Sequence, residues 1–275
     1  MRLPDPRGQH VVVTGSTRGI GRGLAEAFLG LGCRVTVSGR TEAAVDSAVT
    51  ALLAHAPERV HGVPCDVSEL AQVQALWGGA SARFGPVDVW VNNAGVSHSY
   101  LRFWDLPIEE IEAVVETNIL GVIHGTRVAL IGMLAQGHGR IFNMEGLGSD
   151  GRIQPKTIIY GTSKAAVSYF TRAAVQEAEG TPVLVGTLYP GMVVTDLLMA
   201  PMGQDPDALD RTRRIFNILA DRVETVAPYL AVKALATESH GARIRWLTAG
   251  KVLGRFLSAP FARRDVLSDP KRSDS

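Results

Sequence analysis

The sequence predicts an α/β domain with a doubly wound parallel sheet, and three observations support this. Short runs rich in β-branched residues alternate with stretches of ten or more residues that carry apolar side chains at helical spacing. A glycine-rich turn follows the first of these runs. No linker, repeat or low-complexity tract interrupts the pattern before the tail. Strands joined by helices pair in parallel, and right-handed crossovers place helices on both faces. We therefore expect one domain.

The expected elements follow from this alternation. About seven strands are predicted, at His10–Thr14, Arg34–Ser38, Val60–Pro64, Val87–Asn92, Arg140–Met144, Val183–Tyr189 and Arg243–Leu247. Helices are predicted at 21–31, after Thr41 as N-cap, at 70–84, from 108 past Asn118 to about 134, and at 160–177. The domain should cover residues 1–254, with a substrate loop at about 197–225 that contains Pro201, Gly203 and Pro206. A basic tail at 255–275 should end in disorder.

Composition excludes several classes of protein. Hydrophobic residues make up 46% and charged residues 20% of the chain, which is typical of a globular protein. The net charge of +1 predicts no nucleic-acid partner. We see no secretory signal, no stretch as long as a membrane span and no His/Cys cluster with metal spacing. Cys33 and Cys65 adjoin strands and are expected to be buried thiols rather than a redox pair. A reducing, cytoplasmic location is expected.

The turn after the first strand predicts a nucleotide site. Gly15, Gly19 and Gly21 let the backbone turn tightly and approach a pyrophosphate, while the following helix offers free N–H groups. The remaining turn residues are Ser16, Thr17, Arg18 and Ile20. Such glycines also make ordinary tight turns, but their position between a strand and a helix favours nucleotide binding.

The end of the second strand predicts which dinucleotide is bound. An NAD enzyme usually carries an acid there for the ribose 2′-hydroxyl, whereas this chain has Ser38, Gly39 and Arg40. Arg40 offers a guanidinium to a 2′-phosphate, and Arg18 could meet the same group. The alternative is that both arginines are merely solvated, and we favour NADPH.

Four further motifs carry a resemblance to a known family. They are Asn92–Gly95, Asn118, Tyr160–Lys164 and Pro190–Thr195. In this order and spacing the chain resembles the short-chain dehydrogenases/reductases from about Gln9 to Leu247. The resemblance implies a Rossmann-type oxidoreductase that forms a homodimer or homotetramer through the helix around Asn118 and the helix from Tyr160.

A departure from the family pattern narrows the resemblance. Most members carry a serine pair at the end of the fifth strand, where this chain has Glu145 and Gly146. Together with Ile215–Leu219 and the tail, this segment is similar to the chlorophyll b reductases. Those enzymes use NADPH to reduce the ring formyl group of chlorophyll b to a hydroxymethyl group. The resemblance therefore implies a hydrophobic carbonyl substrate such as a formyl-tetrapyrrole.

The chemistry of carbonyl reduction requires a hydride donor and a proton donor. Lys164 lies four residues after Tyr160, so both side chains emerge on one face of a helix, and the lysine charge should bring the tyrosine pKa toward the working range. The resemblance also implies that Lys164 binds the nicotinamide ribose. A surface i,i+4 pair is the alternative, which the cofactor motifs disfavour.

Two catalytic assignments depend on the resemblance. Asn118 matches a helix asparagine that bends its helix and holds a water in a proton relay; a buried amide satisfied by backbone is the alternative. By the resemblance, Gly146 occupies the position of the usual serine, which binds the substrate oxygen. Ser149 either supplies that hydroxyl from a rearranged loop or only decorates a glycine-rich turn. Glu145 is expected to pair with a basic group.

The resemblance assigns the remaining cofactor contacts. Asp66 and Val67 should flank the adenine, and Asn92, Ala94 and Gly95 should contact the adenosine ribose. The segment with Pro190, Gly191, Val193 and Thr195 should bind the cofactor too, the last two at the nicotinamide amide.

Apolar residues at two places bear on the substrate. Leu197, Leu198, Met199 and Met202 give the loop an adaptable lining, or pack as ordinary core. In the tail, arginines alternate with Val252, Leu253, Phe256, Leu257 and Phe261, which predicts a docked terminal helix or an interfacial one. Three functions stay open: a chlorophyll b reductase-like enzyme, a reductase for another hydrophobic aldehyde, ketone or alcohol, and a non-catalytic NADPH-binding regulator.

Overall fold

The computed structural model of the protein describes residues 5–54, 56–199, 213, 215–259 and 264–267. Seven parallel strands form one sheet in the order β3-β2-β1-β4-β5-β6-β7. The strands are β1 (His10–Val13), β2 (Arg34–Gly39), β3 (Val60–Pro64), β4 (Val89–Asn92), β5 (Gly139–Met144), β6 (Val183–Tyr189) and β7 (Arg243–Arg245). The predicted fold class is confirmed.

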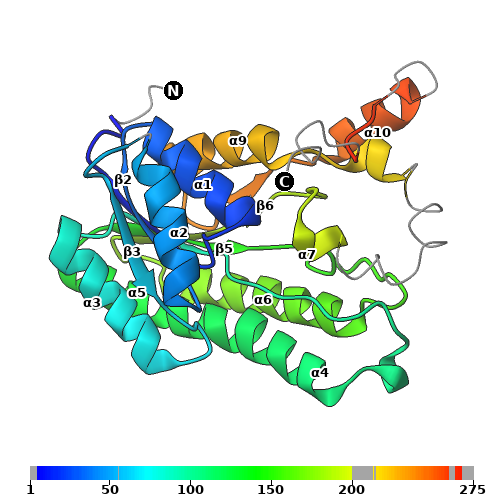
Figure 1. The fold of residues 1–275 in the computed structure, drawn as a ribbon, viewed down its shortest axis with the longest axis horizontal. Helices are drawn as coiled ribbons and strands as arrows, with labels where there is room; N and C mark the ends of the chain where they lie inside the picture. Colours follow the sequence, from blue (N-terminus) through cyan, green and yellow to red (C-terminus); the bar gives the residue numbers. More distant parts are fainter. Residues whose placement is uncertain (1–4, 55, 200–212, 214, 260–263, 268–275) are drawn as a thin grey trace.

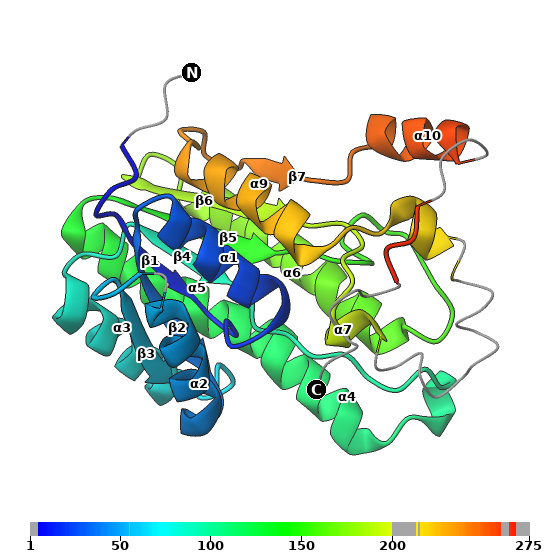
Figure 2. The ribbon, with the colours of Figure 1, turned by 45° about the horizontal axis from the view of Figure 1, so that its top comes forward.

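Helices cover both faces of this sheet (Figures 1 and 2). The helices are α1 (Gly19–Gly30), α2 (Glu42–Leu53), α3 (Leu70–Phe84), α4 (Ile108–Val115), α5 (Gly121–Gln136), α6 (Ile158–Glu177), α7 (Asp196–Met199), α9 (Val223–Leu235) and α10 (Ala249–Ser258), with a 3-10 turn η1 (Phe103–Asp105). One apolar core joins α1, α2 and α9 to the sheet. A second core joins α3, α5 and part of α6 to the opposite face.

Side-chain alternation along the strands separates these two cores. In β1, Val11 and Val13 face the core under α1, whereas Val12 faces the core under α3 and α5. All three are fully buried, as the continuous apolar run predicts for a central parallel strand. Strand order reverses between β1 and β4, so their carboxyl ends open a crevice at the place where doubly wound sheets bind ligands.

The predicted long helix is continuous but irregular. A π-helical segment, η2 (Glu116–Leu120), separates α4 from α5 and contains the buried Asn118. The whole stretch Ile108–Gln136 is 29 residues long and, of the described helices, the one long and apolar enough to cross a membrane. The expectation that no stretch reaches this length is therefore corrected. Its α5 part packs Val128, Ala129 and Met133 into the second core, which makes it a core helix of the fold.

The last described segments are tied to the body through one carboxylate. Asp221 is buried, and its oxygens accept from Arg255 at 2.7 Å, Arg264 at 2.8 Å and the Trp246 indole at 2.6 Å. The two guanidinium groups also donate to backbone carbonyls at 218–220. Tail residues 255 and 264 are thus held to the main domain at this point.

Helix α10 projects from the body in both views (Figures 1 and 2). Thr248 caps its first turn by accepting from the Lys251 N–H. Most of its apolar side chains are exposed, Leu253 by 63% and Leu257 by 69%, whereas Val252 is half-buried. Its docking rests on Arg255 and on the Lys251 ammonium, which lies 3.0 Å from the centre of the Trp246 ring. Phe261, Met202, Pro201, Gly203 and Pro206 lie outside the described residues.

A buried histidine in β1 couples stability to pH. The His10 ring lies among the strands, with Nε2 2.9 Å from the Thr36 hydroxyl and Nδ1 3.3 Å from the Gly85 carbonyl. Burial lowers the pKa of His10 to about 4, because a charged imidazole would lose its hydration there. The folded protein therefore holds a neutral ring that the unfolded chain protonates near pH 6.5.

We expect acid to destabilise the protein through this residue. Between pH 6.5 and 4 the unfolded chain binds the proton and the folded protein does not, so the free energy of unfolding falls with pH by about 2–3 kcal/mol in total. His10→Gln should start from a lower stability at pH 7 and lose less on acidification. Urea unfolding of both proteins at several pH values measures this; parallel curves would contradict the assignment.

Candidate active site

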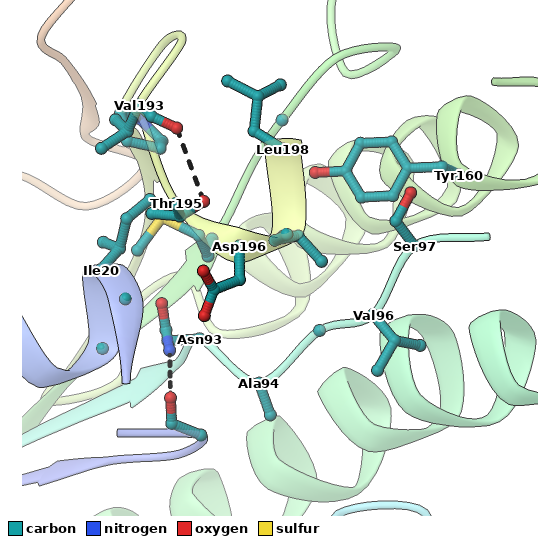
Figure 3. Close-up of a pocket in the computed structure, with 18 of the residues that line it drawn as sticks. Ile20, Asn93, Ala94, Val96, Ser97, Tyr160, Val193, Thr195, Asp196 and Leu198 are labelled. Carbon is teal, nitrogen blue, oxygen red and sulfur yellow. Dashed lines mark hydrogen bonds between the residues drawn. The ribbon is translucent and has the colours of Figure 1, made fainter. Parts of the chain in front are cut away.

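A cavity of about 570 Å³ lies at the carboxyl ends of the strands. The turn after β1, the end of β2, the segment after β4, the end of β5 and the start of α6 all line it. Figure 3 shows Tyr160 projecting from α6 into this space, with Ala94 and Asn93 on the segment after β4 and Leu198 on α7. The crevice expected from strand order is thus a recess that the site residues share.

The glycine-rich turn fits a dinucleotide because side chains are excluded from it. Gly15 has φ +60°, and a Cβ there would lie 2.6 Å from the Ala94 Cα. A Cβ on Gly21 would overlap the Gly15 carbonyl and the Asn93 amide. The turn is therefore pressed against the segment after β4, and α1 begins directly behind it at Gly19. The free N–H groups at that helix start are the donors that a pyrophosphate requires.

Most predicted cofactor residues line the cavity together. From the turn these are Gly15, Thr17, Arg18, Gly19, Ile20 and Gly21, and from elsewhere Arg40, Asp66, Val67, Ala94, Gly95, Tyr160, Lys164, Pro190, Gly191, Val193 and Thr195. They come from six different segments, so the sheet topology brings together residues up to 180 positions apart.

Two predicted cofactor residues lie elsewhere and are corrected. The Ser16 hydroxyl is fully buried; it donates to the Val13 carbonyl at 2.7 Å and accepts from the Ser38 N–H at 2.9 Å, which ties the turn to β2. Asn92 points into the core. Its Oδ1 accepts from the Trp90 indole at 2.7 Å, and its amide donates to Asn143 at 2.8 Å.

The neighbouring Asn93 lines the cavity instead, and sequence reasoning missed it. Its amide donates to the carbonyls of Thr14 and Gly15 at 2.9 and 3.0 Å, so it holds the glycine-rich turn in place (Figure 3). The signal was available. Asn92 shares the parity of Trp90 along β4, and Trp90 faces the core under α3 and α5.

Two arginines lie at the adenosine end of the cavity. Arg40 is exposed and forms no ion pair with a described residue. Arg18 lies 3.8 Å from Asp196, and both side chains are well exposed, so solvent screens this pair. No acidic residue occupies the end of β2.

Tyr160 and Lys164 share one face of α6 and meet at the cavity. The Lys164 ammonium is 5.8 Å from the centre of the Tyr160 ring and donates to the Met144 carbonyl at 3.1 Å. Lys164 is 4% exposed, which excludes the surface-pair alternative. Glycines lie beside both side chains, and Gly146 leaves space for the phenol. A Cβ on Gly95 would come within 3.8 Å of the ammonium, and one on Gly146 within 2.7 Å of the Tyr160 hydroxyl.

Burial governs the protonation of this pair. It raises the pKa of Tyr160 to about 12, to which the charge of Tyr189 adds. It lowers the pKa of Lys164 to about 8, although the Glu145 carboxylate opposes the shift. The expectation that Lys164 lowers the pKa of Tyr160 is therefore corrected for the protein without a bound dinucleotide. The ammonium bonds the Met144 carbonyl rather than the phenol, and desolvation outweighs its charge.

Asn118 reaches the same place from the π-helical segment. Its Oδ1 accepts from the Val96 N–H at 2.8 Å, and its amide donates to the Val96 carbonyl at 2.9 Å and to the Ser163 hydroxyl at 3.0 Å. It is fully buried and does not line the cavity. The extra residue in the π turn thus points the amide at the segment that follows β4. The irregularity that the resemblance implied is present.

The two residues in the place of the usual serine pair have separate environments. The Glu145 carboxylate is buried, and both oxygens accept from Arg243 at 3.2 Å, as the expected pairing required. Ser149 is not brought into the cavity lining. Its hydroxyl accepts from the Gly146 N–H at 3.0 Å and donates to the Lys164 carbonyl at 3.2 Å. Of its two alternatives, the turn residue is the one that the structure shows.

Apolar side chains line the substrate half of the cavity. They are Leu147, Met192, Leu198, Phe216, Leu219 and Leu247. Tyr189 and Arg152 add polar groups on the same side. Of the predicted lining residues, Leu197 and Leu198 are present, and the side chain of Met199 lies outside the described part of the chain.

A glycine cradle before a helix and a buried tyrosine–lysine pair beside a partly apolar pocket define a dinucleotide-dependent oxidoreductase. The family model of the short chain dehydrogenases matches residues 9–204. The chain belongs to the short-chain dehydrogenase/reductase family.

Among curated relatives, chlorophyll(ide) b reductases match most of the chain. The chain is 34% identical over 282 residues to the probable chlorophyll(ide) b reductase NYC1 of Arabidopsis thaliana, covering 96% of this chain and 56% of the relative. It is 38% identical over 260 residues to the chlorophyll(ide) b reductase NOL of Oryza sativa subsp. japonica, covering 90% and 74%. A 3alpha-hydroxysteroid dehydrogenase of Mediterraneibacter gnavus is 33% identical over 190 residues, covering 69% and 75%. The chain thus spans about half the length of the NYC1 relatives.

Solved structures share the fold. A 3-ketoacyl-(acyl-carrier-protein) reductase from Brucella melitensis complexed with NADH has a TM-score of 0.77 at 24% identity, over 88% of this chain and 97% of that one. The closed form of a serine dehydrogenase complexed with NADP+ has a TM-score of 0.74 at 26% identity, over 86% and 92%. The fold therefore accommodates either dinucleotide.

The buried ammonium should cost stability, and its removal should reveal this. At neutral pH Lys164 is charged in both states, and its burial opposes folding. Lys164→Met should raise the free energy of unfolding by about 1–2 kcal/mol, less than the pKa shift alone implies because the Met144 carbonyl loses its donor. Between pH 8 and 9.5 the folded parent releases its proton while the unfolded chain keeps it.

The parent should therefore gain stability over the variant across that pH range, and the difference between them should shrink as pH rises. Denaturant unfolding at pH 7, 8 and 9.5 measures the difference. A variant that is less stable than the parent at pH 7 would contradict this account.

Proposed function

We propose that the protein is an NADPH-dependent reductase that converts a formyl or keto group of a bulky apolar substrate to an alcohol, as in the chlorophyll b reductases. One observation carries the proposal. Tyr160, Lys164 and the glycine cradle line one cavity whose far side is apolar. The 34–38% identity to the chlorophyll(ide) b reductases over most of the chain supports the substrate class.

The chain's own groups divide the work of the reaction. A bound reduced nicotinamide supplies a hydride to the carbonyl carbon. Tyr160 gives its proton to the carbonyl oxygen, where negative charge develops. Lys164, held by the Met144 carbonyl, places a positive charge beside the phenol and supports the tyrosinate that remains. Asn118 fixes the Val96 backbone that faces this pair, and the turn from Gly15 to Gly21 holds the pyrophosphate.

The preference for NADPH is proposed from the end of β2. A ribose 2′-phosphate needs cationic donors, and Arg40 lines the cavity there with Arg18 nearby. An NAD-type acidic partner for the 2′-hydroxyl is missing between Ser38 and Arg40.

Assembly and location stay predictions. A homodimer or homotetramer through α5 and α6 is supported by exposed apolar side chains on these helices, such as Ile131 and Tyr169. The free, buried thiols of Cys33 and Cys65 suit the reducing cytoplasmic compartment that we propose. The chlorophyll(ide) b reductase relatives are described as chloroplastic.

Tyr160→Phe is the direct test of the mechanism. The variant keeps the ring and loses the proton donor, so kcat should fall by about a hundredfold to ten-thousandfold while NADPH affinity stays unchanged. Turnover is followed by NADPH absorbance on a panel of aromatic aldehydes and ketones that includes a formyl-tetrapyrrole. Full activity in the variant would overturn the mechanism. A parent that reduces nothing on the panel while binding NADPH would favour the regulator alternative.

Arg40→Asp tests the choice of cofactor. Charge-assisted contacts to the 2′-phosphate are lost and a repulsion is added, so the Kd for NADPH should rise by about a hundredfold and that for NADH by much less. Arg83→Asp, on α3 and away from the cavity, is the control. The preference is measured by fluorescence titration of both cofactors. A parent that binds NADH more tightly than NADPH would refute it.

A further inference from the structure

Of the catalytic residues assigned so far, only Tyr160 offers a hydrogen-bond donor to the substrate oxygen. Gly146 has no side chain, and the Tyr160 hydroxyl already occupies the space beside it, 2.7 Å from where a Cβ would stand. The Ser149 hydroxyl accepts from the Gly146 N–H and donates its one proton to the Lys164 carbonyl on α6. A carbonyl oxygen that gains negative charge is stabilised by more than one donor. The second donor must therefore come from another element.

Tyr189 is at the right place to be that donor. It is the last residue of β6, which pairs with β5 so that Leu188 lies opposite Met144, and the Glu145 N–H donates to the Leu188 carbonyl. Tyr189 therefore follows the strand end beside Glu145 and Gly146. It lines the same cavity as Tyr160 and is 6% exposed. The Tyr160 hydroxyl lies beside Gly146, so both phenols line the cavity at the end of β5. In keeping with this arrangement, charge on Tyr189 raises the pKa of Tyr160.

The Tyr189 hydroxyl is oriented by Arg152. The guanidinium donates to the phenol oxygen at 2.8 Å and is itself held by the Asp150 carboxylate at 2.8 Å. This contact uses a lone pair of the oxygen and leaves the O–H free to donate. None of the described residues accepts from that O–H. A donor whose oxygen receives a hydrogen bond from a cation is also a stronger donor.

Charges near this position favour an anionic oxygen. Arg152, whose charge is partly balanced by Asp150, bonds the phenol oxygen, and the Arg245 guanidinium lies 5.5 Å from the centre of the Tyr189 ring. The one carboxylate at the end of β5, Glu145, is paired with Arg243 and so is partly neutralised. Negative charge that develops at the carbonyl oxygen would thus meet cations on the Tyr189 side of the cavity.

We propose that the Tyr189 hydroxyl, positioned by Arg152, donates the second hydrogen bond to the substrate oxygen that Tyr160 protonates. The inference rests on the proposed carbonyl reduction and names a further catalytic residue for it. Tyr189 keeps its proton throughout. The hydride forms the new C–H bond, the carbonyl π electrons move to oxygen, and Tyr160 supplies the proton that forms the O–H bond. Arg152 is a positioning residue, because it acts through Tyr189.

Tyr189→Phe is the variant that tests the inference. It keeps the ring and its contact with Arg245, and kcat should fall by about a hundredfold with NADPH affinity unchanged. Tyr229→Phe on α9, outside the cavity lining, is the matched control and should retain full turnover. Ser149→Ala should cost far less than Tyr189→Phe. If Ser149→Ala loses activity and Tyr189→Phe does not, the role belongs to Ser149 and the inference is wrong.

The role of Arg152 is separated from a structural one by two further variants. Arg152→Gln should reproduce part of the Tyr189→Phe loss, and Arg152→Lys should recover some of it by restoring the charge. Combining Arg152→Gln with Tyr189→Phe should add little to the loss from Tyr189→Phe alone, since both changes remove the same hydrogen bond. Additive losses would show that Arg152 acts independently of Tyr189.

A measurement without turnover distinguishes this inference from the proposed function. The C=O stretching frequency of a ¹³C-labelled aromatic aldehyde, bound with NADP+ so that no reduction occurs, reports the hydrogen bonds to its oxygen. The frequency should be lowered in the parent, less so in Tyr189→Phe, and unchanged from the parent in Tyr229→Phe. A parent that lowers the frequency yet reduces no carbonyl would contradict the proposed function alone. Equal frequencies and equal kcat in the parent and Tyr189→Phe would overturn the inference alone.

Discussion

The burial of the Lys164 ammonium is the constraint on which the catalytic end of the molecule depends. A charge this deeply buried is stable only where the backbone and nearby charges compensate it. The Met144 carbonyl accepts a hydrogen bond from the ammonium. Burial lowers the pKa of Lys164, and the Glu145 carboxylate partly offsets this by raising it. Arg243 on the edge strand then balances Glu145. A series of alternating charges therefore runs from the cavity to the edge of the sheet.

The same constraint bears on the small residue at position 146. A Cβ on Gly146 would press on the Tyr160 hydroxyl at 2.7 Å and on the Lys164 chain at 3.3 Å, whereas a Cβ on Gly95 would make only ordinary contact with the ammonium, at 3.8 Å. The π turn at Asn118 is a further accommodation. The π turn interrupts the regular hydrogen-bond pattern of the helix from Ile108 to Gln136. It places the Asn118 side chain against the Val96 backbone. Positions that weaken regular structure are thus gathered round one buried charge.

Sequence reasoning succeeded where a pattern has one structural meaning. Alternating strands and helices predicted the sheet, and the order of the motifs predicted which loops meet at the cavity. It failed where direction or environment decides. Asn92 and Asn93 are chemically identical, and only the parity of β4 sends the first into the core and the second to the cavity. The pKa of Tyr160 depends on whether burial or a neighbouring charge dominates, and spacing along a helix contains neither quantity. The sequence predicts Tyr189 only as the end of a strand, because Arg152, which donates a hydrogen bond to its hydroxyl, is 37 residues away in sequence.

The ion pairs of Asp221 with Arg255 and Arg264 bear on where the domain ends. A boundary at residue 254 keeps every strand of the sheet, yet it removes the two guanidinium groups that neutralise this buried carboxylate. An uncompensated buried charge typically costs about 3–5 kcal/mol, a large share of the stability of an ordinary domain. The Asp221 carboxylate also accepts a hydrogen bond from the Trp246 indole. The backbone N–H of Asp221 donates to the carbonyl of Met192, which lines the cavity. Arg255 and Arg264 therefore belong to the fold of the catalytic unit, and a chain without them would be expected to loosen first around Asp221, on the substrate side of the cavity.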